Sequence, residues 1–132
     1  MILFLDASAM VAMITAEPGS PALEERFGAA EEIVCSAISL WEAARAIARK
    51  RTVPITLAFS EIETFVADFA IRLVPIGARE SAVAVDSYQR YGKGTGHAAK
   101  LNMGDCFAYA CAKTNDASLL YKGNDFLHTD LA

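Results

Sequence analysis

The chain alternates between short apolar runs and longer segments in which apolar residues recur every three or four positions. The runs at 2–5, 33–36, 71–76 and 118–121 predict strands that are buried on both faces. Helical periodicity occupies the segments between them, at about 8–14, 21–27, 38–51, 57–69, 79–91 and 104–113. Strands alternating with helices predict an α/β fold, a three-layer sandwich in which helices cover both faces of a central, mainly parallel sheet.

A chain of 132 residues has the size of one domain, and we expect residues 1–132 to form a single domain. The composition, 54% hydrophobic and 21% charged, is typical of globular proteins, and no apolar run is long enough to cross a bilayer. Three cysteines without a C-x-x-C spacing predict reduced thiols in the core and a cytoplasmic location. The net charge of -4 argues against nucleic-acid binding over the whole surface but allows a local basic patch.

The first apolar run ends on a carboxylate. Asp6 follows Leu5 directly, and Asp125 lies in the turn after the last predicted strand. Glu42 and Asp105 lie near the starts of two predicted helices. Functional groups in parallel sheets collect beyond the carboxyl ends of the strands, so these four acids can face one crevice.

Each acid also has a local explanation. Asp6 can cap the helix that follows it. The stretch Ser39–Glu42 has the sequence of a capping box, and Arg45 is a candidate ion-pair partner for Glu42. Asp105 can be a first-turn acid with Asn102 as its cap, and the acid at 125 can be an ordinary turn residue. Taken singly, none of them indicates catalysis.

Together, the four acids indicate a metal site. Carboxylates packed in one crevice repel one another and raise one another's pKa, so such a cluster calls for a cation. An all-oxygen donor set without a Cys or His pair favours Mg²⁺ or Mn²⁺ over zinc. Mg²⁺ uses one or two carboxylates and leaves positions for phosphate oxygens, which predicts metal-assisted hydrolysis of a phosphodiester.

Four stretches occur in a characteristic order along the chain: "FLDASAM" at 4–10, "SAISLWEAARAI" at 36–47, "NMGDCFAYACAK" at 102–113 and "LLYKGNDFLHTDL" at 119–131. In order, spacing and total length they resemble the PIN-domain ribonucleases, and specifically the VapC-type toxins of bacterial toxin–antitoxin pairs. The most specific part is "GDCFAYA" followed by "GNDF". The resemblance covers essentially the whole chain and implies a PIN-like fold and an Mg²⁺-dependent endoribonuclease.

The resemblance also implies roles for individual residues. The family's acidic quartet falls on Asp6, Glu42, Asp105 and Asp125 as catalytic residues and metal ligands. Ser8 takes the position of a small hydroxyl residue that supports the metal site or the scissile phosphate.

The fourth acid of this set has more than one candidate. Asp116 competes with Asp125, but it precedes the last predicted strand and should lie at the opposite end of the sheet. Asp130 is a further candidate, as an outer ligand or a loop cap. Asn124 can contact the fourth acid or the substrate.

Two basic groups can hold RNA. Arg45 and Arg49 share one side of the helix that carries Glu42, and we interpret them as substrate or partner contacts. Lys50 and Arg51 fit a solvated helix face better than phosphate binding. The second group, on a stretch without acids, consists of Arg90, Lys93 and Lys100.

Partner surfaces are expected on helices rather than on loops. The apolar helices at 21–27 and 58–69 can leave a groove for a peptide. The resemblance implies a VapB-like antitoxin in such a groove, where it also blocks the active site, and a homodimer. The aromatic residues Trp41, Phe107 and Tyr109 have helical spacings and are expected in the core.

Two other classes of function stay open at this point. An aspartate-dependent phosphoryl-transfer domain also ends its first strand on Asp, but "DAS" lacks the second acid of a D-x-D motif, and Lys122 is its one candidate lysine. A non-catalytic PIN-like binding module is the other class, although all four acids are present.

Overall fold

The computed structural model describes residues 1–132 and shows an α/β fold with one parallel sheet. The strands are β1 (Ile2–Leu5), β2 (Glu32–Cys35), β3 (Arg72–Leu73) and β4 (Ser118–Leu120), in the order β3-β2-β1-β4. The helices are α1 (Ala7–Ile14), α2 (Ser20–Ala29), α3 (Ala37–Arg51), α4 (Ile55–Asp68), α5 (Ala78–Tyr91) and α6 (Met103–Thr114). All three strand pairings are parallel, which confirms the predicted fold class.

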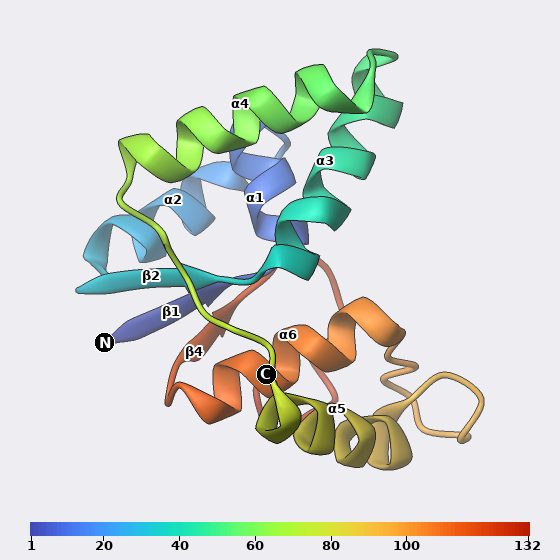
Figure 1. The fold of residues 1–132 in the computed structure, drawn as a ribbon. Helices are drawn as coiled ribbons and strands as arrows, with labels where there is room; N and C mark the ends of the chain where they lie inside the picture. The colour runs from blue at the N-terminus through green and yellow to red at the C-terminus, as the bar shows by residue number, and fades with distance from the viewer.

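Helices cover both faces of the sheet. Figure 1 shows α1 to α4 on one side of the strands and α5 with α6 on the other. On β1, Leu3 and Leu5 pack into the core on the α1–α3–α4 side, whereas Phe4 between them packs into the core on the α5–α6 side. The first strand is therefore apolar on both faces because each face lies against its own layer of helices.

The predicted strand at 71–76 is much shorter in the structure. Only Arg72 and Leu73 pair with β2, and β3 forms the edge of the sheet, with both residues exposed. Val74 still donates its N–H to the carbonyl of Cys35 at 2.8 Å, but Pro75 has no N–H with which to extend the ladder.

The carboxyl ends of the strands lie at one end of the sheet, where two helices begin directly. Asp6 is the N-cap of α1 immediately after β1, and Ser36 is the N-cap of α3 immediately after β2. The N-terminus of α6 approaches α3 there from the opposite layer, because Gly104 lies against Glu42. None of the helices is long and apolar enough to cross a membrane.

Candidate active site

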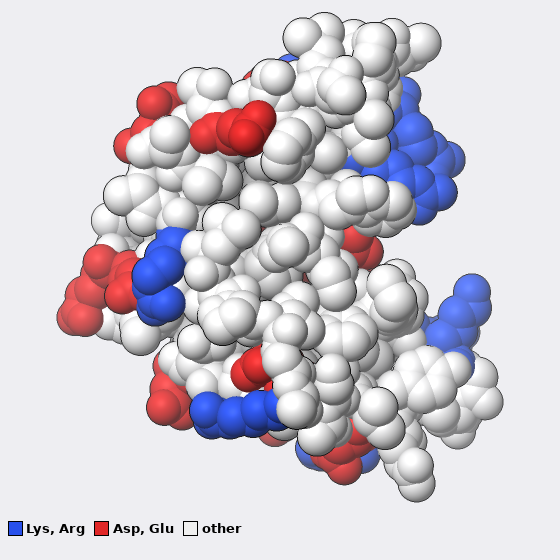
Figure 2. Space-filling view, in the orientation of Figure 1, with Lys and Arg blue, Asp and Glu red and all other residues white.

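An open crevice lies at the carboxyl ends of the strands, between α1, α3 and the N-terminus of α6. In Figure 2 the molecule is hollowed between the upper helices and the α5–α6 layer, with acidic atoms inside the hollow and basic side chains on both margins. The residues that line the crevice are Asp6, Ala7, Ser8, Val11, Glu17, Glu42, Ala46, Asn102, Asp105, Lys122, Gly123 and Asp125. The four acids singled out in the sequence therefore meet in one place.

Asp6 is fixed by the start of α1. Its Oδ2 accepts the backbone N–H of Ser8 at 3.0 Å and also the Ser8 hydroxyl, so Asp6 is indeed the helix cap. Its own N–H donates to the carbonyl of Leu120, which ties the end of β1 to the end of β4. Its Oδ1 receives no hydrogen bond from the protein, so capping uses only one of the two carboxylate oxygens.

Asp105 is held in the same way at the start of α6. Asn102 caps this helix by accepting the N–H of Asp105 at 2.9 Å, and Asp105 Oδ2 accepts the N–H of Asn102 at 3.1 Å. This reciprocal capping box confirms the local interpretation of Asp105. It also leaves Oδ1 of Asp105 without a protein donor. The caps therefore orient both acids rather than exclude them from chemistry.

For Glu42 the local explanation was wrong. The N-cap of α3 is Ser36, whose Oγ accepts the N–H of Ser39 at 3.2 Å, so Glu42 lies beyond the first turn. Glu42 forms no ion pair with Arg45 either. Instead its carboxylate packs against Gly104, so closely that a Cβ atom at residue 104 would collide with both of its oxygens. No local feature of α3 accounts for this half-buried carboxylate.

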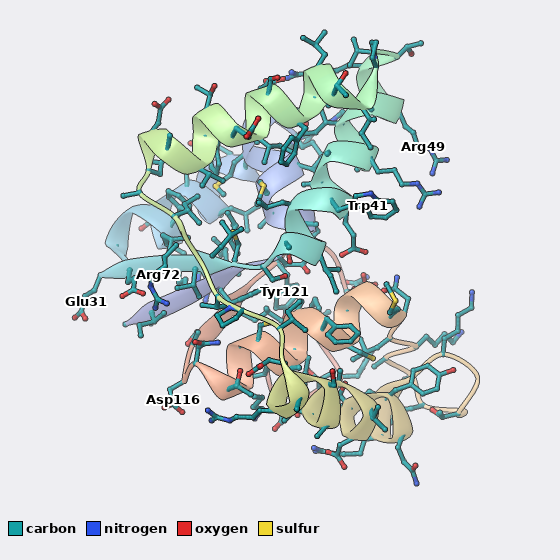
Figure 3. The ribbon with its side chains drawn as sticks, viewed as in Figure 1. Glu31, Trp41, Arg49, Arg72, Asp116 and Tyr121 are labelled. Atoms are coloured by element: carbon teal, nitrogen blue, oxygen red, sulfur yellow. The ribbon has the colours of Figure 1, made fainter.

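The candidates for the fourth acid separate clearly. Asp125 lines the crevice, whereas Asp116 lies at the opposite end of the sheet, as Figure 3 shows. Asp130 accepts the hydroxyl of Tyr109 at 2.7 Å and the ammonium of Lys113 at 2.6 Å, away from the crevice. The structure thus favours Asp125 by position and gives Asp130 an ion pair instead of the proposed roles as an outer ligand or loop cap. Asn124 is exposed beside Asp125 but does not line the crevice.

The carboxylates influence one another's protonation. Burial is the main cause of the raised pKa of Asp6, and the charge of Asp125 adds to it. Burial also raises the pKa of Glu42, with a contribution from Asp6. The pKa of Asp105 is raised from 3.8 to about 7, first by burial and then by the charges of the other three acids, against the opposing hydrogen bond from Asn102. The crevice therefore disfavours the fully ionised cluster in the absence of a cation.

The donor set of the crevice consists of oxygen atoms. Neither a histidine nor a cysteine lines it, and the three cysteines are free and buried elsewhere. No three His, Cys, Asp or Glu side chains approach closely enough to enclose one ion. A site of this kind suits a cation that takes one or two carboxylates and completes its shell with water, as Mg²⁺ does, better than zinc.

Apart from Lys122, which lines the crevice, the nearby basic side chains flank it. Arg45 and Arg49 are exposed on α3 and form no ion pair, and Figure 3 shows Arg49 projecting from the helix into solvent. Lys50 and Arg51 are paired with Glu17 and Glu61. In the second basic group, Lys93 and Lys100 are exposed without ion pairs, whereas Arg90 contacts Asp86 at 3.7 Å.

Glu17 and Gly104 at the crevice were missed by sequence reasoning, and Lys122 was named only as the candidate lysine of a phosphoryl-transfer domain. Glu17 and Lys122 line it as an ion pair between segments 105 positions apart, and Gly104 provides room for Glu42. Pairing between Glu17 and Lys122 leaves no local pattern. The glycine directly before Asp105 in "NMGD" was a usable signal, because glycine in the first turn of a helix often marks a close approach.

An apolar groove runs beside the crevice between α3 and α4, with β3 at its end. It is lined mainly by Leu40, Trp41, Ile55, Phe59 and Leu73. Trp41 is 57% exposed, which corrects its predicted place in the core; Tyr109 is buried as predicted, and Phe107 packs partly buried on the core.

The position of this groove corrects a second expectation. The helix predicted at 58–69 does line this groove, through Phe59, but its partner across the groove is α3. The helix at 21–27 does not line it; its Phe27 packs on Phe65 and Phe69 with ring centroids 5.9 and 5.2 Å apart.

Comparison with known proteins agrees with this geometry. The family model described as PIN domain matches residues 3–131. A VapC ribonuclease of Rhizobium meliloti (strain 1021) is 39% identical, and the match covers 97% of this chain and 98% of that protein. Ribonuclease VapC30 of Mycobacterium tuberculosis is 39% identical over 97% of this chain and 95% of its own length. Ribonuclease VapC42 of the same species is 32% identical, with 98% and 96% covered.

A solved structure shows the same fold. The crystal structure of Mycobacterium tuberculosis VapC20, described as a sarcin–ricin loop cleaving toxin, matches with a TM-score of 0.70 and 16% sequence identity. The match covers 95% of this chain and 92% of that one. The family model and the relatives aligned along nearly their whole length show that this chain belongs to the PIN-domain family, among its VapC ribonucleases.

Proposed function

We propose that this ribonuclease is an Mg²⁺-dependent endoribonuclease, with Mn²⁺ as an alternative cofactor, and that Asp6, Glu42, Asp105 and Asp125 form its catalytic metal site. The observation that carries the proposal is the meeting of these carboxylates, from four separate segments, in one crevice. The raised pKa of Asp105, caused first by burial and then by the charges of the other three acids, supports it, because a cluster that resists full ionisation gains from a bound cation.

The chain's own groups supply orientation. Hydrogen bonds to Oδ2 of Asp6 and of Asp105 leave the other oxygen of each carboxylate available for the cation. Packing against Gly104 holds Glu42 between α3 and α6. When bound, Mg²⁺ supplies activation of the attacking water and stabilisation of the leaving oxygen of the phosphodiester. No histidine lines the crevice to serve as a general base, which agrees with this assignment.

Four further residues are proposed to support the metal site or to contact the RNA substrate. Ser8 joins Asp6 to the backbone of Lys122 and so supports the metal site. Arg45 and Arg49 are exposed on α3 without an ion pair, and the Arg45 guanidinium lies over the Trp41 ring, 5.8 Å from its centroid. RNA phosphates are suitable partners for both guanidinium groups. Asn124 is exposed and adjacent in sequence to Asp125, and it is the fourth proposed RNA contact.

Metal removal tests the proposal most directly. Treatment with a chelator should abolish RNA cleavage by the purified protein, and addition of Mg²⁺ or Mn²⁺ should restore it. Asp105→Asn should be inactive with or without metal and should bind Mn²⁺ more weakly by calorimetry, whereas the exposed Asp68→Asn on α4 serves as a matched control. Cleavage that continues unchanged in excess chelator would refute the metal-dependent mechanism.

We also propose that the chain is the toxin of a type II toxin–antitoxin pair, with a VapB-like antitoxin in the α3–α4 groove. The groove and the crevice share α3, since Trp41 lines the first and Glu42 the second. An apolar antitoxin helix seated on Trp41 can therefore place its flanking residues at the metal site.

Expression in bacteria tests this pairing. Production of the protein alone should arrest growth, Asp105→Asn should relieve the arrest at equal protein level, and Trp41→Ala should weaken rescue by a co-expressed small protein from the neighbouring reading frame. Equal toxicity of Asp105→Asn would contradict the nuclease as the cause of the arrest.

A homodimer completes the proposal, through the face formed by α5 and α6. Val85 is 71% exposed there beside Tyr88 and Met103, around a shallow hollow lined by apolar residues alone. A second copy of the chain would cover this apolar surface. Light scattering should give twice the chain mass for the native protein and the monomer mass for Val85→Lys.

A further inference from the structure

Lys122 is the one cation among the residues that line the acidic crevice. The same lining contains five acids: Asp6, Glu17, Glu42, Asp105 and Asp125. RNA carries a negative charge at every phosphate, so a strand that approaches this crevice is repelled unless positive charge compensates. The place and the partners of this lysine therefore decide how a substrate can enter.

The backbone of Lys122 is coupled to the candidate metal site. Its N–H donates to Oγ of Ser8 at 3.0 Å, and the same Oγ donates to Oδ2 of Asp6. One serine thus fixes the position of residue 122 relative to the first acid. The side chain of Lys122 is 38% exposed, and the hydrogen bond of its backbone keeps it at the crevice.

The ammonium group of Lys122 belongs to a three-residue cluster. Oε1 of Glu17 accepts from Nζ of Lys122 at 3.1 Å, and Oε2 of Glu17 accepts from Nζ of Lys50 at 3.0 Å. Lys50 is held further by Oγ1 of Thr15 at 2.7 Å. The two lysines lower the pKa of Glu17, which stays ionised between them. The cluster therefore carries one net positive charge at the rim of an acidic site.

We propose that Lys122 and Lys50, spaced by Glu17, form a subsite for an RNA phosphate next to the scissile one. The inference rests on the proposed ribonuclease function and deepens it. An ammonium group has three donors, and Lys122 uses one of them on Glu17, so two are available to phosphate oxygens. Glu17 is the counterion that the two ammonium groups share before the RNA arrives, and it competes with a phosphate for their donors.

A binding experiment without cleavage tests the subsite. In the Asp105→Asn background, the affinity for a fluorescent single-stranded RNA oligonucleotide of mixed sequence is measured over a series of salt concentrations. Lys122→Gln should weaken binding by about three- to tenfold and reduce the slope of log Kd against log salt by about 0.7, the value for one lost contact to a single strand. Lys122→Arg should retain both the affinity and the slope, because the charge is kept.

The chain offers a matched control. Lys113, on the last turn of α6, has a side chain 37% exposed and an ion pair with Asp130, but it does not line the crevice. Lys113→Gln should leave RNA affinity and salt slope unchanged. If Lys122→Gln behaves like Lys113→Gln, or if the oligonucleotide fails to bind the Asp105→Asn protein at low salt, the subsite is refuted.

Glu17→Gln distinguishes a phosphate subsite from a purely structural ion cluster. Loss of the carboxylate removes a negative charge from the rim, so RNA should bind more tightly even if the melting temperature falls. Weaker binding of RNA by Glu17→Gln would show that the cluster only holds the loop in place. These outcomes are separate from the nuclease proposal, which fails instead if Asp105→Asn still cleaves RNA.

Discussion

The carboxylate of Glu42 occupies the space in which a Cβ atom on residue 104 would stand. Glu42 lies on α3 and Gly104 in the first turn of α6, so this contact joins the two helix layers across the crevice. Glycine is required here by the close approach and not by its backbone angles, because a positive φ occurs at other glycines of the chain but not at Gly104. The contact makes the place of Glu42 depend on a residue that has no functional group.

Gly104→Ala should therefore displace Glu42 and lower activity. We expect RNA cleavage to fall more than tenfold and the free energy of unfolding to fall by about 1–3 kcal/mol, the usual effect of overpacking. Activity assays and denaturant unfolding measure the two effects.

Gly28→Ala is the matched control for that substitution. Gly28 also lies within a helix, α2, and a Cβ atom there would meet nothing within 4 Å. This variant should be as active as the native protein and up to about 1 kcal/mol more stable, because alanine favours helix. In a Glu42→Ala background the destabilisation by Gly104→Ala should disappear; a loss of the same size in both backgrounds would contradict the contact.

Ser8→Ala tests the link between Asp6 and Lys122. It removes the hydroxyl that donates to Asp6 and accepts from the backbone of Lys122, and leaves that N–H without its partner. We expect a loss of about 1–2 kcal/mol in stability, typical of a broken and unsatisfied hydrogen bond, and weaker binding of Mn²⁺. Calorimetry and thermal melting measure both.

Ser60→Ala is the control for Ser8→Ala, since the Ser60 hydroxyl bonds only to its own helix at an exposed position. It should leave metal binding unchanged and stability within about 0.5 kcal/mol. Unaltered Mn²⁺ affinity in Ser8→Ala would mean that Asp6 does not depend on this hydroxyl.

The sequence was sufficient to predict the layers and the meeting of the acids, for a physical reason. The alternation of apolar runs with helical periodicity gives the boundaries of the strands and helices, and these boundaries show which residues lie at the carboxyl ends of the strands. Asp6 and Asp125 follow directly from that rule. Asp105 follows from its helix cap, which is a local pattern as well.

Contacts between distant segments could not be predicted in this way. The capping box assigned to Ser39 was wrong because Ser36, three residues earlier, caps the helix, and serine is a favoured N-cap residue at either position. Trp41 has the spacing of a core residue, but α4 packs so as to leave it on the wall of a groove. The ion pair of Lys122 with Glu17 depends on how the loops after β4 and α1 meet, and no local sequence pattern predicts that contact.

Stability of the metal-free protein should depend on pH through Asp105. Its pKa is raised from 3.8 to about 7 in the folded state, so between pH 4 and 7 the folded protein keeps a proton that the unfolded chain releases. The free energy of unfolding should therefore fall as pH rises through this range and level off above pH 7. The loss is on the order of 2 kcal/mol, since one pKa unit corresponds to about 1.4 kcal/mol and solvent screening at the open crevice reduces the effect.

Chemical denaturation at several pH values checks this dependence. Asp105→Asn should flatten the curve and be at least as stable as the native protein at pH 8, because a repelled charge is gone. Mg²⁺ should raise the stability of the native protein above pH 7. A native curve that rises from pH 4 to pH 7 would contradict the arrangement of like charges.

The last prediction concerns which aspartate completes the site. Asp125→Asn should lower cleavage more than tenfold and weaken Mn²⁺ binding, because it removes a charge from the crevice while keeping the side-chain shape. Asp116→Asn should be fully active: Asp116 is exposed at the other end of the sheet, and asparagine tolerates its φ of 50° equally well. Asp130→Asn loses its charge pair with Lys113, so it should cost no more than about 1 kcal/mol in stability and keep its metal affinity. The three variants are measured in parallel at equal folded fraction. If the Asp116 or Asp130 variant loses Mn²⁺ binding and Asp125→Asn does not, the fourth carboxylate lies outside this crevice.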